Sequence, residues 1–178
     1  PQLQNSLRSL ASEIRNTAHQ LHPRTFEVLG LAPSLARLAD DLSQRTQVGV
    51  EFTNQCDGQV AASDAALCLY RVAQEALRNI EQHSGAKHAK MMLRCKSGSL
   101  ELIIEDGGKG FDLDAARQAG ALGLTSMVER VRLVGGNLQI ESRAGAGTRI
   151  TAQIPMDDSG AKSNGDADVV CDSVSGAG

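Results

Sequence analysis

Four polar side chains near the middle of the chain could share one face of a helix. In the segment 63–84, apolar residues recur at helical spacing on one stripe, namely Ala66, Leu69, Tyr70, Ala73, Leu77 and Ile80. At 100° per residue, Glu75, Asn79, Gln82 and His83 gather on the opposite side. A carboxylate, an amide and an imidazole can build a polar site, but from the helix alone a solvated surface is the simpler interpretation.

A second segment with chemical potential is "IIEDGGKGFD", residues 103–112, in which one carboxylate, Asp106, is followed by three glycines. Such a turn can serve a tight bend, or it can let a flat or phosphorylated ligand approach the backbone where a side chain would block it. The segment by itself does not choose between these uses.

The elements that must position these residues follow from caps and periodicity. Ser63 is the expected N-cap and Gly85 the stop of the long helix. Further helices are predicted over 31–47 and 122–136, a short strand over 48–55, and two antiparallel hairpins over 88–106 and 137–155. This order predicts an α/β (α+β) two-layer sandwich, with helices covering one face of a mostly antiparallel mixed sheet.

The two ends of the chain differ from its centre. Leu3, Leu7, Leu10, Ile14 and Leu21 form an apolar seam that ends at Pro23, and it fits either a coiled-coil helix or an ordinary amphipathic one. Residues 157–178 are small and polar, as expected of a disordered tail. We therefore expect a helical remnant over 1–23, one domain over 24–156 and a tail over 157–178. The first residue is Pro1 rather than Met, which suggests a piece of a longer protein.

Composition removes several classes of function. The 178 residues carry a net charge of −3 and only 2% aromatic residues, so the basic face and the stacking platforms of nucleic-acid binders are not expected. Four cysteines stand far apart without a C-x-x-C pair, which argues against a zinc site and predicts scattered thiols in a reducing compartment. No apolar run reaches the length of a membrane span and no signal peptide opens the chain.

Four motifs, in this order and spacing, resemble one known domain. "QEALRNIEQHSGA", "EDGGKGFD", "ALGLTSMVERV" and "SRAGAGTRI" are similar to the ATP-binding domain of bacterial two-component sensor histidine kinases, within the superfamily that includes DNA gyrase B. The upstream "LHPRTFEVLGLAPSLARLA" resembles the join to the dimerisation helices in the nitrate-sensor-like subfamily. The resemblance covers roughly residues 5–156.

The resemblance implies a role for each motif residue in binding ATP and Mg²⁺. Asp106 would accept a hydrogen bond from the adenine amino group, and Gly108 and Gly110 would let the backbone bend around the base. Asn79 would ligate Mg²⁺ through its side-chain oxygen, and Glu75 would orient a water of the metal shell or act as a base.

Other motif residues would surround the nucleotide. His83 would approach it from the last helical turn, and Thr148 would close the adenine pocket through its hydroxyl. Residues 111–122 would form a short lid that leads, with Gly123 and Leu124, into a helix N-terminus suited to phosphate oxygens.

The chain also departs from the family pattern. Gln82 stands where a lysine usually lies beside the phosphates, Gly107 replaces a polar residue after Asp106, and Ala119 and Ala121 stand in the lid where glycines are common. A weaker hold on the triphosphate and a stiffer lid are the expected consequences.

The phosphoacceptor histidine of the family is followed by an acidic residue, but His19 precedes Gln20 and His22 precedes Pro23. The expected function is thus to transfer the γ-phosphate of Mg-ATP to a histidine outside this chain, in a cytoplasmic homodimer that passes it to a response regulator. A membrane would be reached only through upstream segments. An anti-sigma-type serine kinase, a nucleotide-sensing module without phosphotransfer and a gyrase-like clamp are the alternatives.

Overall fold

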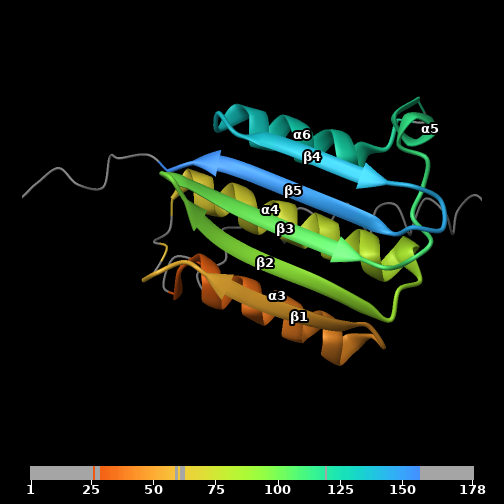
Figure 1. Cartoon of the computed structure of the whole chain (residues 1–178), viewed down its shortest axis with the longest axis horizontal. Helices are drawn as coiled ribbons and strands as arrows, with labels where there is room; N and C mark the ends of the chain where they lie inside the picture. The colour runs from red at the N-terminus through yellow and green to blue at the C-terminus, as the bar shows by residue number, and fades with distance from the viewer. Residues whose placement is uncertain (1–25, 27–28, 59, 61–62, 119, 157–178) are drawn as a thin grey trace, which may run out of the picture.

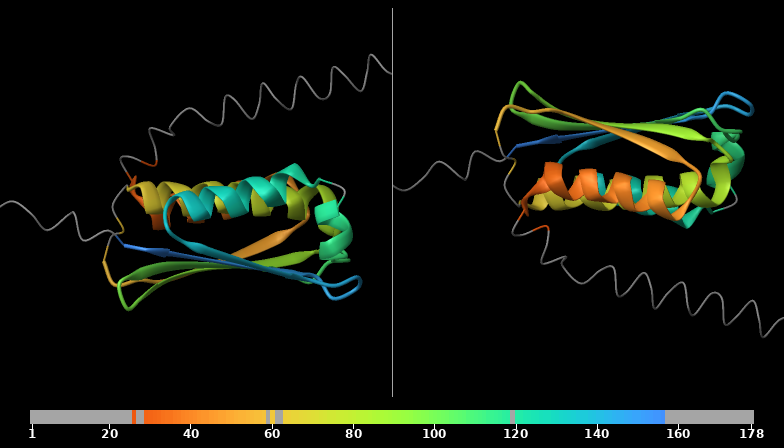
Figure 2. Two further views of the ribbon diagram at one scale, coloured as in Figure 1. Left: turned by 90° about the horizontal axis from the view of Figure 1, so that it is seen from above. Right: turned by 90° about the horizontal axis from the view of Figure 1, so that it is seen from below.

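A single mixed sheet forms one layer of the molecule, and helices cover one of its faces (Figures 1 and 2). The computed structural model describes residues 26, 29–58, 60, 63–118 and 120–156. The strands are β1 (Gly49–Gln55), β2 (His88–Lys96), β3 (Ser99–Asp106), β4 (Asn137–Ser142) and β5 (Thr148–Pro155), in the spatial order β1-β2-β3-β5-β4. β1 pairs with β2 in parallel and every other pairing is antiparallel, which confirms the predicted fold class.

Within the described residues, three α-helices run along the sheet and a fourth, shorter α-helix closes its end. The long helices are α3 (Leu31–Arg45), α4 (Asp64–Asn79) and α6 (Leu122–Leu133), and the short one is α5 (Leu113–Gln118). The apolar stripe predicted for α4 is buried against the sheet, so the core lies between the two layers. The expected N-terminal helix and the tail lie outside the described residues.

The long central helix begins and ends where its sequence signals predict, but its last turn differs. Ser63 is the N-cap, and its hydroxyl accepts a hydrogen bond from the backbone N–H of Ala66 at 3.2 Å. After Asn79 the chain widens into a π-helical turn, η1 (Ile80–Ser84), and Gly85 ends it with a φ of 69°. Such turns recur at functional sites, because they change the direction in which side chains point.

On the face of the sheet opposite α3, α4 and α6, charged residues of alternating sign lie side by side. The register places Glu51, Lys90, Glu105, Arg149 and Glu141 opposite one another in a row that crosses all five strands with alternating sign. Within this row Arg149 Nη1 and Glu105 Oε1 lie 2.6 Å apart. Opposite charges on facing strands stabilise a sheet, so this solvent-facing side needs no covering layer.

The prediction of scattered thiols is wrong for two of the cysteines. Cys56 and Cys95 form a disulfide across a sequence separation of 39 residues. The parallel register that pairs Gln55 with Arg94 brings the two residues together, and sequence spacing does not reveal such a pairing. Cys68 is buried in α4, where burial raises the pKa of its thiol to about 11, while Cys171 lies outside the described residues.

The described part of the chain contains no helix that is long and apolar enough to cross a membrane.

Candidate functional site

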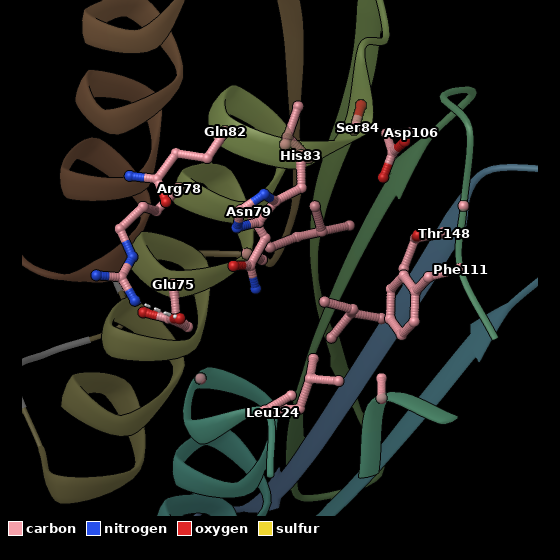
Figure 3. Close-up of a pocket in the computed structure, with 18 of the residues that line it drawn as sticks. Glu75, Arg78, Asn79, Gln82, His83, Ser84, Asp106, Phe111, Leu124 and Thr148 are labelled. Carbon is pink, nitrogen blue, oxygen red and sulfur yellow. Dashed lines mark hydrogen bonds and ion pairs between the residues drawn. The ribbon is translucent and has the colours of Figure 1, made fainter. Parts of the chain in front are cut away.

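A cavity of about 390 Å³ opens between the C-terminal half of α4, the adjoining end of the sheet and the segment before α6 (Figure 3). All four residues of the predicted polar helix face line it: Glu75, Asn79, Gln82 and His83. Asp106, Gly110, Gly123, Leu124 and Thr148 line it as well. Segments far apart in the sequence thus meet at one place, and the face of α4 is not an ordinary solvated surface.

The four polar residues that line the cavity from this side come from the last part of α4 and from the π-helical turn η1. Glu75 and Asn79 lie one turn apart on α4, whereas Gln82 and His83 lie on the π-helical turn beyond it. Glu75 and Asn79 are half-buried, and Gln82 and His83 are exposed at the opening. A carboxylate and an amide oxygen one turn apart are hard donors of the kind that Mg²⁺ prefers.

Asp106, the last residue of β3, is oriented by the turn that follows it. Its Oδ1 accepts a hydrogen bond from the backbone N–H of Gly108 at 2.9 Å. The next N–H, that of Lys109, donates to the carbonyl of Ser84 at 2.8 Å. The glycine-rich turn is therefore tied to the end of η1 and holds the carboxylate in place.

Steric contacts require a glycine at position 108 but not at position 107. A Cβ at Gly108 would overlap the carbonyl and hydroxyl oxygens of Ser84 and come within 2.8 Å of Asp106 Oδ1, whereas one at Gly107 would meet nothing within 4 Å. The close approach of Ser84 is what requires a glycine at 108.

The loop between β4 and β5 supports the turn from the other side. A Cβ at Gly147 would overlap the carbonyl of Asp106, and one at Gly110 would overlap that of Arg143; both glycines have positive φ, 78° and 55°. The backbone N–H of Gly145 donates to the carbonyl of Lys109 at 2.6 Å. These contacts pack two turns against each other with no room for side chains between them.

Thr148 lies directly opposite Asp106 in the β3–β5 register. Its hydroxyl and that of Ser142 are 3.0 Å apart, and Ser142 also accepts from the N–H of Phe111 at 2.9 Å. The Ser142 hydroxyl thereby links the lid segment, β4 and β5 around the Asp106 end of the cavity.

The floor of the cavity is apolar. Ile104 of β3 and Ile150 of β5 are register partners, and Phe111 and Leu124 also line the cavity (Figure 3). A mostly apolar cavity with a few polar groups at defined places is typical of a small-molecule site. Here a carboxylate lies at each end, Asp106 at one and Glu75 at the other, and Figure 3 shows the two apart.

In its described part, residues 111–118 and 120–122, the predicted lid segment includes a short helix. It contains α5, whose first N–H groups, from Asp114 and Ala115, donate to Asp112 Oδ1 at 3.0 Å each. The segment leads into α6 at Ala121, the N-cap of that helix, where no side-chain cap is formed. A Cβ at Gly123 would overlap Glu75 Oε1, so the first turn of α6 lies directly on that carboxylate.

Sequence reasoning missed several residues of the cavity. Arg78 Nη2 lies 2.7 Å from Glu75 Oε1, and Lys109, Ser84 and Phe111 also line the cavity. Arg78 could have been found from the same helical spacing, because it lies three residues after Glu75 and four before Gln82. Ser84 could not, because its place depends on the tertiary contact with the turn at 107–109.

Among the described residues, no group of three or more His, Cys, Asp or Glu side chains is placed to hold a metal ion. Asn79 and Glu75 still fit Mg²⁺ that arrives with a phosphate ligand, since Mg²⁺ commonly takes one or two protein oxygens and completes its shell with water and phosphate.

The site and fold together define a domain with a small-molecule cavity at the end of an α/β sandwich. Comparison with protein families places residues 64–158 in the family described as histidine kinase-, DNA gyrase B- and HSP90-like ATPase. The match covers more than half of the chain, and the chain belongs to this family of ATPases.

The chain is also similar to individual curated proteins, which are sensor histidine kinases. The signal transduction histidine-protein kinase/phosphatase DegS of Brevibacillus brevis is 30% identical over 86% of this chain and 40% of its own length. The sensor histidine kinase MctS of Rhizobium johnstonii is 35% identical over 84% of this chain and 33% of its own length. Within the ATPase family, this chain is thus similar to sensor histidine kinases, and it spans about two fifths or less of the length of these relatives.

Solved structures agree on the fold. The histidine kinase domain of the blue-light activated histidine kinase from Erythrobacter litoralis has a TM-score of 0.61 at 22% identity, covering 75% of this chain and 69% of that one. The ATP binding domain of PrrB from Mycobacterium tuberculosis has a TM-score of 0.55 at 21% identity, covering 70% and 93%.

Proposed function

We propose that the cavity binds Mg-ATP and that the domain transfers the γ-phosphate to a histidine on a dimerisation helix. The observation that carries this proposal is the placement of Asp106 and Asn79 in one cavity with an apolar floor between them. Adenine would lie on Ile104 and Ile150 with its amino group toward Asp106, and the phosphates would extend toward Asn79 and Glu75.

In this proposal the protein's own groups act mainly by position. Asn79 supplies a side-chain oxygen to Mg²⁺, and Glu75 orients a metal-bound water or accepts a proton from the incoming imidazole. When bound, Mg²⁺ offsets the charge that develops on the phosphoryl oxygens. Gly108, Gly110 and Thr148 shape the adenine end, while His83, Gly123 and Leu124 border the rest of the nucleotide.

The same proposal extends to the whole protein. Residues 24–156 would form the ATP domain, residues 1–23 would be the remnant of a dimerisation helix, and the phosphate would pass to a response regulator. We propose a cytoplasmic domain, because ATP is supplied there. A disulfide is uncommon in that compartment, so the Cys56–Cys95 bond would form only under oxidising conditions.

Calorimetry with and without Mg²⁺ tests the proposal. Wild-type protein should bind ATP more tightly with Mg²⁺ than with EDTA, and Asn79→Ala should remove that difference, because the variant lacks the metal-ligating oxygen. Asn137→Ala, an exposed change at the start of β4 and outside the cavity, is the matched control. An Asn79→Ala variant that keeps the full Mg²⁺ dependence would contradict the assignment.

A nucleotide-sensing module without phosphotransfer is the second candidate, favoured by the neutral Gln82 at the cavity opening. Binding of Mg-ATP with no phosphate reaching a supplied histidine-bearing helix would identify it.

A further inference from the structure

The basic residues that line the cavity come from segments at opposite ends of it. Arg78 and Lys109 are the arginine and the lysine among the described lining residues. Lys109 belongs to the turn after Asp106, where its N–H is bound to the carbonyl of Ser84. Arg78 lies on α4 beside Glu75, and Figure 3 shows it at the end of the cavity away from Asp106.

Arg78 is held at this end by an ion pair. Its Nη2 lies 2.7 Å from Glu75 Oε1, and the two side chains are 35% and 21% exposed. Both are thus partly shielded from water, where a charge interaction is stronger than on an open surface. The same Glu75 oxygen lies against Gly123, so the pair sits under the first turn of α6, at the edge of the cavity.

Position 82, one helical turn beyond Arg78, contributes no charge. Gln82 lines the same cavity with a neutral amide. A triphosphate bound near Asn79 would meet Glu75, which repels it, and would need a cation at that end besides Mg²⁺. Among the described lining residues, Arg78 meets this need, because the turn that carries Lys109 follows Asp106 at the other end.

We propose that Arg78 is the phosphate-binding cation of this cavity, with Glu75 as its counter-ion in the empty state. This inference rests on the proposed function. The planar guanidinium suits phosphate, because it presents several N–H donors in a fixed fork that can engage two oxygens at once. A bound phosphate would share the guanidinium with Glu75 and so couple the nucleotide to the residue beneath the first turn of α6.

Adenosine, ADP and ATP, each with Mg²⁺, form a ligand series that tests this role by calorimetry on the whole chain. Arg78→Gln should weaken ATP by roughly tenfold or more, since a hydrogen bond to a charged group is lost. Adenosine affinity should stay within about twofold, because Arg78 lies away from the adenine end. Arg78→Lys keeps the positive charge but not the forked set of N–H donors, so its ATP affinity should lie between those of the wild type and Arg78→Gln.

Two further variants separate charge from structure. Gln82→Lys added to Arg78→Gln should restore most of the lost ATP affinity, because it returns a cation to the same cavity. Arg45→Gln removes the same charge and also breaks an ion pair, with Glu81 at 3.0 Å, but Arg45 does not line the cavity; its three affinities should match those of the wild type.

The outcomes are distinguishable. An equal loss of adenosine and ATP affinity, no loss of either, or a failure of Gln82→Lys to restore ATP binding would overturn the assignment of Arg78 while leaving the proposed function intact. A wild-type chain that binds none of the three ligands would overturn the proposed function itself. If circular dichroism shows that Arg78→Gln does not fold, Arg78→Lys decides: the ratio of ATP to adenosine affinity should fall, and an unchanged ratio refutes the proposal.

Discussion

The carboxylate of Asp106 has one oxygen held by the N–H of Gly108, and the turn around it is fixed by Ser84 and the loop before β5. A rigid acceptor of this kind distinguishes purines by the group at position 6, because adenine offers an amino donor there and guanine offers a carbonyl oxygen. The identity of the base would therefore be read at a single residue.

Asp106→Asn should weaken ATP, and GTP should bind poorly to both forms. A buried acceptor without its donor costs about 1–3 kcal/mol, so the wild type should prefer ATP over GTP by roughly tenfold or more. Competition of both nucleotides for the site, measured by calorimetry, checks this, with Asp57→Asn as an exposed control. Equal affinity of the wild type for ATP and GTP would rule out the base-reading role.

Gly107 and Gly108 are adjacent glycines that differ in the space around them, so the same substitution can be compared at both positions. Gly108→Ala places a methyl group against the backbone and hydroxyl oxygens of Ser84, so we expect a loss of about 1–3 kcal/mol in unfolding free energy and weaker ATP binding. Gly107→Ala meets open space and should change neither. Urea unfolding of the two variants measures the difference, and similar stabilities for both would show that the turn is not packed as described.

At the scale of elements, the Cys56–Cys95 disulfide joins the ends of the paired strands β1 and β2, far from the cavity. β2 pairs its first residues, from Ala89, with the Asp106 end of β3, whereas Cys95 pairs with Leu100 at the other end. The disulfide therefore ties the edge strand to the sheet without touching the candidate site.

Reduction of the Cys56–Cys95 bond should lower the unfolding free energy by about 3–4 kcal/mol, because a closed loop of this length restricts the unfolded chain. ATP affinity should not change. Urea unfolding of the wild type with and without dithiothreitol measures the effect, and a variant with both Cys56→Ser and Cys95→Ser is the control that should not respond. A wild type insensitive to the reductant would show that the bond does not form in solution.

The two faces of the sheet differ in what lies on them. Helices cover one face of the sheet and take part in the cavity, whereas the other face carries the alternating row of charges described above. The candidate site thus lies at one end of the molecule, and under the proposed function a histidine that receives phosphate would have to be brought to that end.

This chain alone should not accumulate acid-labile phosphate on histidine when given Mg-ATP. His19 and His22 lack the neighbouring carboxylate that would take the imidazole proton, and both lie outside the described residues. The test uses γ-labelled ATP, first with the chain alone and then with a supplied helix that carries a histidine followed by an acidic residue. Label on His19 or His22 in the chain alone would contradict the prediction.

Much of the fold was accessible from local signals. The Ser63 cap, the stop at Gly85 and the apolar stripe of α4 each act within a few residues, so they predict the helix without knowledge of its neighbours. The same holds for the hairpins, whose alternation and turn residues are local. The candidate site was found because its four motifs are short and ordered along the chain.

Other features depend on segments that meet only in the folded molecule. Local periodicity carries no information on which strands become neighbours, so the parallel β1–β2 register and the Cys56–Cys95 bond were not predicted. Ser84 acquires its role from the turn at 107–109. Arg78 and Glu75 are neighbours on α4, but only the packing of α6 places its first turn over Glu75. The sequence by itself determined the long helices, the strands, their order and most of the residues capable of chemistry. Only the tertiary structure decided which cations and oxygens share the cavity, because burial and charge pairing depend on contacts between residues distant in the chain.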